Sequence, residues 1–178
     1  MLSIEEVSAQ AKLACLESGH HMPMMIICSE KGDGIIGFGN MPDTTEQKTK
    51  MFFMAGKEVA KKQPGSIVKS IFFITEAWMS KCQKGEIPDV RPSQDPKRKE
   101  VLIINQLQMI PEKKSDGVMM EMIRDASNKL TGLGDAELAE GTESPLLKAF
   151  YVGFYMGDKI PEEELGSKVE IEDFKPKS

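Results

Sequence analysis

Residues 68–78 read VKSIFFITEAW, and this stretch decides the fold class. Its four consecutive apolar residues, Ile71–Ile74, are β-branched or aromatic, and so short a run favours a strand over a buried helix. Residues 101–107, VLIINQL, have the same character. Between the two runs, the polar stretch 81–99 carries Pro88, Pro92 and Pro96, which is typical of a long irregular connection. We therefore expect two strands joined by this connection.

Towards the amino terminus, residues 3–18 predict an amphipathic helix. Ser3 and Glu6 have the spacing of a capping box, and Gly19 supplies a stop. The apolar runs 24–28 and 35–38 then flank a turn-forming cluster of Ser, Gly and charged residues. This arrangement predicts a β-hairpin.

A second helix is expected after Pro42. Either Asp43 with Glu46 or Thr44 with Gln47 has the spacing to cap its amino terminus. Apolar residues then line one side at helical intervals, until Pro64-Gly65 ends the helix. Such a helix would cover the sheet.

The segment 112–141 can be read in two ways. Its central part, 117–133, fits helical spacing and also fits two strands around a turn at 125–128. The turn residues and the poor helix formers at 131–134 favour a hairpin. A last amphipathic helix is predicted to begin near Ser144-Pro145, because proline is favoured in a first helical turn.

Consecutive strands with short turns predict an α+β fold. We expect a single antiparallel sheet of about four to six strands, covered by an N-terminal, a central and a C-terminal helix. Residues 1–160 would form one domain. Residues 161–178 are strongly charged and poor in apolar side chains, a composition typical of disordered tails.

Composition narrows the function classes. Of 178 residues, 40% are hydrophobic and 29% charged, as in globular proteins. No apolar run approaches the roughly 20 residues that cross a bilayer. Three cysteines are an odd number, which predicts reduced thiols and a cytoplasmic location. The net charge of −5 disfavours nucleic acid as a partner.

No cofactor and no metal site are predicted. Gly32, Gly34 and Gly37 match the spacing of a dinucleotide-binding loop, but no helix follows them, so a glycine-rich hairpin is the better interpretation. His20 and His21 are adjacent, and no second pair of His or Cys stands at ligand spacing.

The predicted strand end at Glu76 and Trp78, with the connection after it, is the best candidate site. Glu76, Asp89 and Asp95 are the candidate catalytic carboxylates, because a carboxylate at a rigid strand end can act as a general base. Trp78, Arg91 and Arg98 are the candidate binding residues, since arginine can hold an anion. The alternative is structural: Trp78 packs on the connection, and Glu76 pairs with an arginine across the sheet edge.

The same residues carry a resemblance. The chain is similar to a group of short microbial and phage-associated proteins over about its central third, and the group brings no activity, ligand or catalytic residue with it. The matching residues are Glu76-Ala77-Trp78, Arg91-Pro92-Ser93, Pro96, Arg98 and Glu100-Val101-Leu102.

Three functions are therefore compared. The leading hypothesis is a non-enzymatic binding or assembly domain that self-associates, because no catalytic constellation is evident. The alternative is a small hydrolase-like enzyme with a carboxylate and arginine site around Glu76 and Arg91. A weaker alternative is nucleic-acid binding through Lys97–Lys99, which the neighbouring Asp95 and Glu100 oppose.

Overall fold

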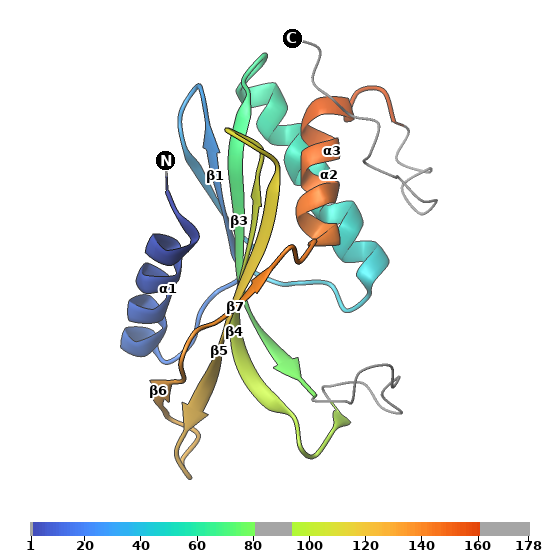
Figure 1. Ribbon diagram of the computed structural model, residues 1–178. Coiled ribbons are helices and arrows are strands. Elements are labelled where there is room, and N and C mark those ends of the chain that lie inside the picture. Colours follow the sequence, from blue (N-terminus) through green and yellow to red (C-terminus); the bar gives the residue numbers. More distant parts are fainter. Residues whose placement is uncertain (1, 81–93, 161–178) are drawn as a thin grey trace.

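The computed structural model describes residues 2–80 and 94–160 (Figure 1). The charged tail and most of the connection between the two central strands lie outside these ranges. Within them, the elements run in the order α1 (Ile4–Ser18), β1 (Met24–Ser29), β2 (Gly34–Gly37), α2 (Thr45–Lys62), β3 (Val68–Met79), β4 (Lys99–Gln108), β5 (Lys114–Arg124), β6 (Leu130–Leu133), β7 (Glu137–Glu140) and α3 (Pro145–Met156).

The strands form one antiparallel sheet, which confirms the predicted α+β class. Its strand order is β2-β1-β3-β4-β5-β6, and β7 pairs with β5 beside β6. The predicted β1–β2 hairpin and the β3–β4 pair are both present. The short strand β7 was not predicted. The four residues of its sequence, ELAE, are all exposed, and the sequence lacks the apolar alternation that indicates a strand.

The ambiguous segment is a hairpin of β5 and β6, as its turn residues indicated. Asn128 adopts a left-handed conformation with φ of 64°, which asparagine tolerates better than most residues. The Asp125 carboxylate accepts hydrogen bonds from the backbone N–H groups of Ser127 and Lys129, at 2.8 and 3.0 Å. Local side-chain chemistry therefore fixes this turn.

The two possible caps of α2 are also resolved. Thr44 is the N-cap, and its hydroxyl accepts the N–H of Gln47 at 3.2 Å. At α1, Ser3 and Glu6 form the predicted capping box. Both helices therefore begin where a side-chain oxygen can accept one of the unpaired N–H groups of the first turn.

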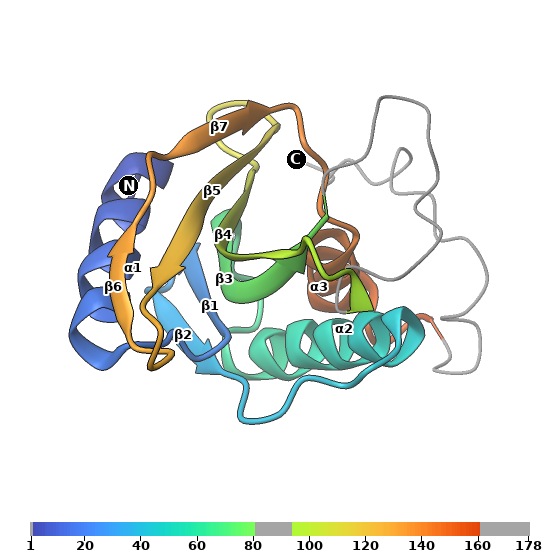
Figure 2. The ribbon, with the colours of Figure 1, turned by 90° about the horizontal axis from the view of Figure 1, so that it is seen from below.

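Helices lie on both faces of the sheet, with α1 on one side and α2 and α3 on the other (Figure 2). Because side chains alternate along a strand, the four buried residues Ile71–Ile74 of β3 point in turn to the two faces of the sheet. Phe72 and Ile74 join the core beneath α1, whereas Ile71 and Phe73 join the core beneath α2 and α3.

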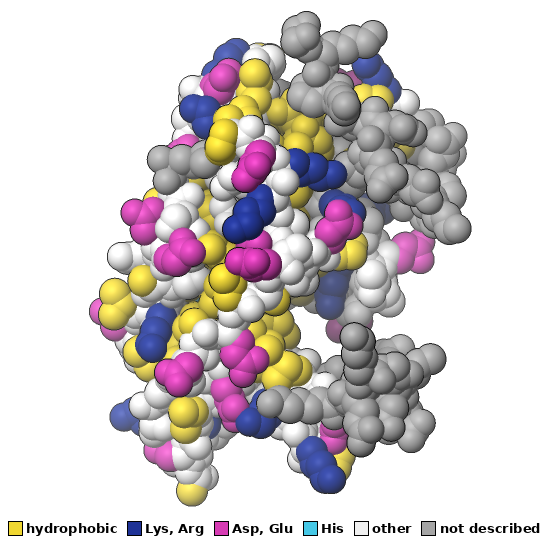
Figure 3. All heavy atoms as spheres, in the orientation of Figure 1, with side chains coloured by type: hydrophobic (Ala, Val, Ile, Leu, Met, Phe, Trp, Pro, Cys, Tyr) yellow, Lys and Arg dark blue, Asp and Glu magenta, His cyan; other side chains and the backbone are white. Residues whose placement is uncertain are grey.

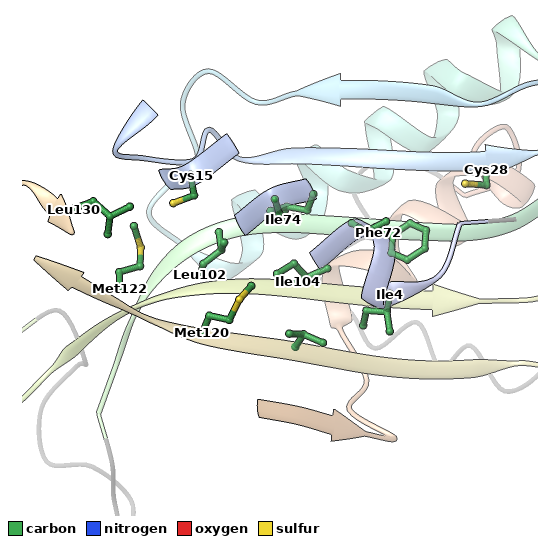
Figure 4. Close-up of a cluster of buried hydrophobic side chains, with 13 residues drawn as sticks. Ile4, Cys15, Cys28, Phe72, Ile74, Leu102, Ile104, Met120, Met122 and Leu130 are labelled. Carbon is green, nitrogen blue, oxygen red and sulfur yellow. The ribbon is translucent and has the colours of Figure 1, made fainter. Parts of the chain in front are cut away.

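The core beneath α1 is mainly aliphatic and sulfur-rich, with the ring of Phe72 among its side chains (Figure 4). One side of α1 is buried at helical intervals, through Ile4, Val7, Ala11 and Cys15. It meets the alternate residues of the strands, and α1 contacts β4, β5 and β6. The strands contribute Cys28, Phe72, Ile74, Leu102, Ile104, Val118, Met120, Met122 and Leu130.

On the opposite face, α2 and α3 approach each other so closely that only glycine fits between them. A Cβ added to Gly153 would lie 2.0 Å from the carbonyl oxygen of Phe53. One added to Gly56 would lie 2.1 Å from the carbonyl oxygen of Phe150. The two helices thus form a close pair, and Phe52 of α2 contacts the sheet by meeting the ring of Phe73 on β3 edge-on, while it stacks on Phe38 just after β2.

We expect Gly153→Ala to destabilise the fold by about 3 kcal/mol, because the added methyl group meets backbone and forces the helices apart. Gly39→Ala is the matched control, since its Cβ would find nothing within 4 Å. Urea unfolding of both variants measures the difference. Equal stability of the two variants would contradict the close helix approach.

A second prediction concerns alkaline pH. Burial raises the pKa of Tyr151 to about 12, so the folded state keeps a proton that the unfolded chain loses near pH 10. The free energy of unfolding should be intact below pH 10 and fall by about 3 kcal/mol as the pH rises to 12. Tyr151→Phe should remove this part of the pH dependence in unfolding titrations. A decline that is identical in both proteins would refute this origin.

Candidate functional site

The face of the sheet under α1 changes from apolar to charged along β3. Phe72, Ile74, Glu76 and Trp78 alternate along the strand and therefore share this face. The first two lie in the core, Glu76 is half-buried, and Trp78 is 46% exposed. The predicted site residues of β3 thus stand where the apolar layer ends, next to the C-terminal end of α1.

Arg124 at the end of β5 is the central cation of this region. Its Nε and Nη2 donate to the two carboxylate oxygens of Glu100 on β4. Its Nη1 donates to the carbonyl oxygens of Gly19, at 3.1 Å, and Asn128, at 3.4 Å. The Glu100 carboxylate raises the pKa of the Arg124 guanidinium. Arg124 therefore ties the C-cap of α1 to β4 and to the β5–β6 turn.

Glu76 is held by the chain that follows α1. The backbone N–H of His21 donates to its Oε1. Burial raises the pKa of the nearby Cys15 thiol, and the negative charge of Glu76 raises it further. A thiol with a raised pKa and no exposed surface is a poor nucleophile. Glu76 thus accepts a backbone hydrogen bond from the chain that follows α1, and Cys15 offers no activated thiol beside it.

Trp78 and Arg98 form the one contact that the structure provides between predicted binding residues within its described part. The guanidinium carbon of Arg98 lies 4.5 Å from the centroid of the Trp78 ring, within the range of cation–π attraction. Asp95 accepts the backbone N–H of Lys97 at 2.8 Å. Asp89 and Arg91 lie outside the described residues.

Two of the basic residues that suggested nucleic-acid binding, Arg98 and Lys99, contact other side chains of the protein. Lys99 forms an ion pair with Glu121 on the neighbouring strand, and Arg98 lies over Trp78. Charged side chains of both signs are spread over the face of the molecule seen in Figure 3, with hydrophobic ones between them. Nucleic-acid binding stays a prediction that these contacts do not favour.

A groove of about 570 Å³ runs beside α1, over β1. Its floor is apolar, and its far end reaches His21, whose N–H binds Glu76. The groove therefore joins the charged region at one end. Its lining includes Leu2, Glu6, Val7, Gln10, Ala14, His21, Met24, Ile26 and Ile74.

Two smaller hollows accompany the groove. One of about 290 Å³ lies on the opposite flank of α1, between the helix and Val118, Met120 and Leu138. Another of about 220 Å³ lies between Met79 and the loop before β7. Hollows on both flanks of α1 mean that this helix does not fill the space over the sheet.

Two further findings concern metals and membranes. Within residues 2–80 and 94–160, no three His, Cys, Asp or Glu side chains gather into a group that could hold a metal ion. Among the described helices, none is long and apolar enough to span a membrane.

Compared with known proteins, the chain matches no family model, no curated protein and no solved structure. The resemblance suggested by its central third therefore stays a prediction, and any function must be argued from the geometry.

Arg124 and its partner Glu100 were missed as a pair by the sequence analysis. A signal existed, because Met120, Met122 and Arg124 alternate along one strand once the hairpin interpretation is adopted. What the sequence lacked was the register of β4 against β5, which places Glu100 within reach of Arg124.

The ion pair between Arg124 and Glu100 should stabilise the fold. Their side chains are only 19% and 17% exposed, so we expect Glu100→Gln to cost about 2 kcal/mol, the worth of a partly buried charged hydrogen bond. Glu121→Gln is the control, because its pair with Lys99 is well exposed and should cost under about 0.5 kcal/mol. Chemical unfolding compares them. Similar losses in both variants would show that Arg124 does not hold this end of the molecule together.

Proposed function

We propose that this protein is a non-enzymatic binding or assembly domain that works as a homo-oligomer in the cytoplasm. The observation that carries the proposal is the unequal cover of the two faces of the sheet. Two helices pack on one face, and one helix packs on the other. The groove beside α1 lies in the part that this single helix leaves open.

Elementary dimensions support this view. Six neighbouring strands span about 24 Å at roughly 4.8 Å per spacing. One helix with its side chains covers about 10 Å, so a second helix is needed to cover such a face. The pair α2 and α3 meets that need on its own face, whereas α1 contacts β4, β5 and β6 and leaves the groove over β1.

The distribution of exposed apolar side chains supports the same surface. Among the described residues, ten large hydrophobic side chains are exposed, and five of them belong to α1, its flanking residues or the β1–β2 hairpin. Water-exposed apolar groups that gather on one side favour contact with another molecule. These five are Leu2, Leu13, Leu16, Met22 and Ile35.

The charged region supports a structural role more than a catalytic one. Arg124 makes four hydrogen bonds to protein acceptors, and Glu76 accepts a backbone N–H. A general base needs a carboxylate that can take a proton from a substrate. The assembly hypothesis therefore ranks above the enzyme built on Glu76 and Arg91.

The test of this proposal is the mass in solution. The chain weighs 19.8 kDa, and we expect light scattering after size-exclusion chromatography to give a multiple of this value, with a dimer the simplest. Sedimentation equilibrium over a dilution series should show dissociation, as mass action requires. A mass of one chain up to the solubility limit would overturn the proposal.

A further inference from the structure

We infer that the groove beside α1 receives α1 of a second copy, so that two copies share one layer of two antiparallel helices between their sheets. This inference rests on the proposed self-association and names its surface. Each face of each sheet would then be covered by two helices. The following features of α1 and of the groove support this arrangement.

The groove has the length of a helix like α1. Its lining follows α1 from Leu2 to Ala14 and continues to His21 beyond the helix. A helix of 15 residues is about 22 Å long. The groove thus borders α1 from its first turn to Ala14 and reaches the chain just beyond the helix, as a helix packed beside it would need.

The outer side of α1 is apolar as well as its inner side. Ala9, Leu13 and Leu16 recur at intervals of four and three residues, which places them in one stripe. This stripe lies opposite the buried residues Ile4, Val7, Ala11 and Cys15. Leu13 and Leu16 are 54% and 40% exposed in the single chain. A helix that is apolar on two opposite sides is expected to be buried on both.

The floor of the groove matches that stripe. Met24 and Ile26 of β1 line it, and Ile35 of β2 is the register partner of Ile26, so its side chain stands on the same face. Ile35 is 70% exposed. The partner's outer stripe therefore meets an apolar floor, and the reciprocal contact follows from two-fold symmetry.

The flank of α1 that borders the groove suits a helix neighbour. Gln10 and Ala14 are uncharged, and the Glu6 carboxylate accepts a hydrogen bond from the backbone N–H of Ser3 at 2.8 Å. Antiparallel helices also place opposite dipole ends side by side.

The contact has a suitable size. One face of a helix of this length measures about 22 by 10 Å. Each of the two symmetric contacts buries such a face and the floor beneath it, so the buried area is on the order of 900 Å² before the helix–helix contact is added. Stable interfaces begin near about 1,200 Å². The free edge of β2 offers only four residues for pairing with another strand, so the groove is the larger surface.

The first test uses charge on the outer stripe. We expect Leu13→Glu to weaken dimerisation at least about tenfold, because the interface would bury this position twice. Ile123→Glu on β5 is the matched control, since Ile123 is 49% exposed and alternates with Met122, so it faces away from the side of the sheet that α1 covers. Its dissociation constant should stay within about twofold of the wild type. Thermal unfolding checks that both variants fold.

The second test locates the contact. In a Cys82→Ser background, protein with Leu13→Cys is mixed with protein carrying Ile26→Cys, and a short bismaleimide is added. Linked dimers are expected from the mixture, because Leu13 points away from its own sheet. Cys15 and Cys28 are buried and should not react.

The outcomes separate the two proposals. Monomers throughout would end both the assembly function and this arrangement. Dimers that persist in Leu13→Glu would keep the assembly function and refute the seating of the outer stripe of α1 in the groove, whatever the effect of Ile35→Lys. Dimers that neither substitution weakens, with no link from position 13 to position 26, would also refute the shared helix layer.

Discussion

Everything in this fold depends on burying both faces of one strand. The side chains of Ile71–Ile74 in β3 point alternately to opposite sides, and all four are buried. No single layer of helices can cover them. The sheet must therefore lie between two helical layers. The chain forms one layer from α1, and the other from α2, which precedes β3 in the sequence, and α3, which follows β7. The hydrophobic effect at β3 thus dictates the layered architecture.

The two helical layers cover the two faces of the sheet to different extents. On one face, Gly56 and Gly153 allow α2 and α3 to touch along their backbones, and two helices share the cover of the sheet. On the other, α1 stands alone with hollows on both flanks. A second α1 from another copy would complete this face, which connects the architecture to the proposed assembly function. The same arrangement would bury Leu13 and Leu16, which are exposed on the outer side of α1 in the single chain.

The charged end of the α1 face marks where the apolar layer stops. There Arg124 joins Glu100 to the C-cap of α1 at Gly19, and Glu76 accepts the N–H of His21. The sequence singled out Glu76, Trp78 and Arg98 as neighbours, and the structure does stack Arg98 on Trp78. It could not pair Arg124 with Glu100, because a pairing across strands depends on register. These contacts fix the end of α1 and the groove beside it.

Local chemistry in the sequence determined the elements: apolar periodicity gave the helices and most strands, capping residues set the starts of α1 and α2, and Asp125 with Asn128 indicated the β5–β6 turn. Their type depends on neighbours a few residues away, so the sequence carries it directly. Tertiary structure alone decided the strand order, strand β7, the partners of Arg124 and the uncovered groove. These depend on contacts between residues far apart in the chain, such as Arg124 and Gly19, and local patterns do not specify which distant surfaces meet.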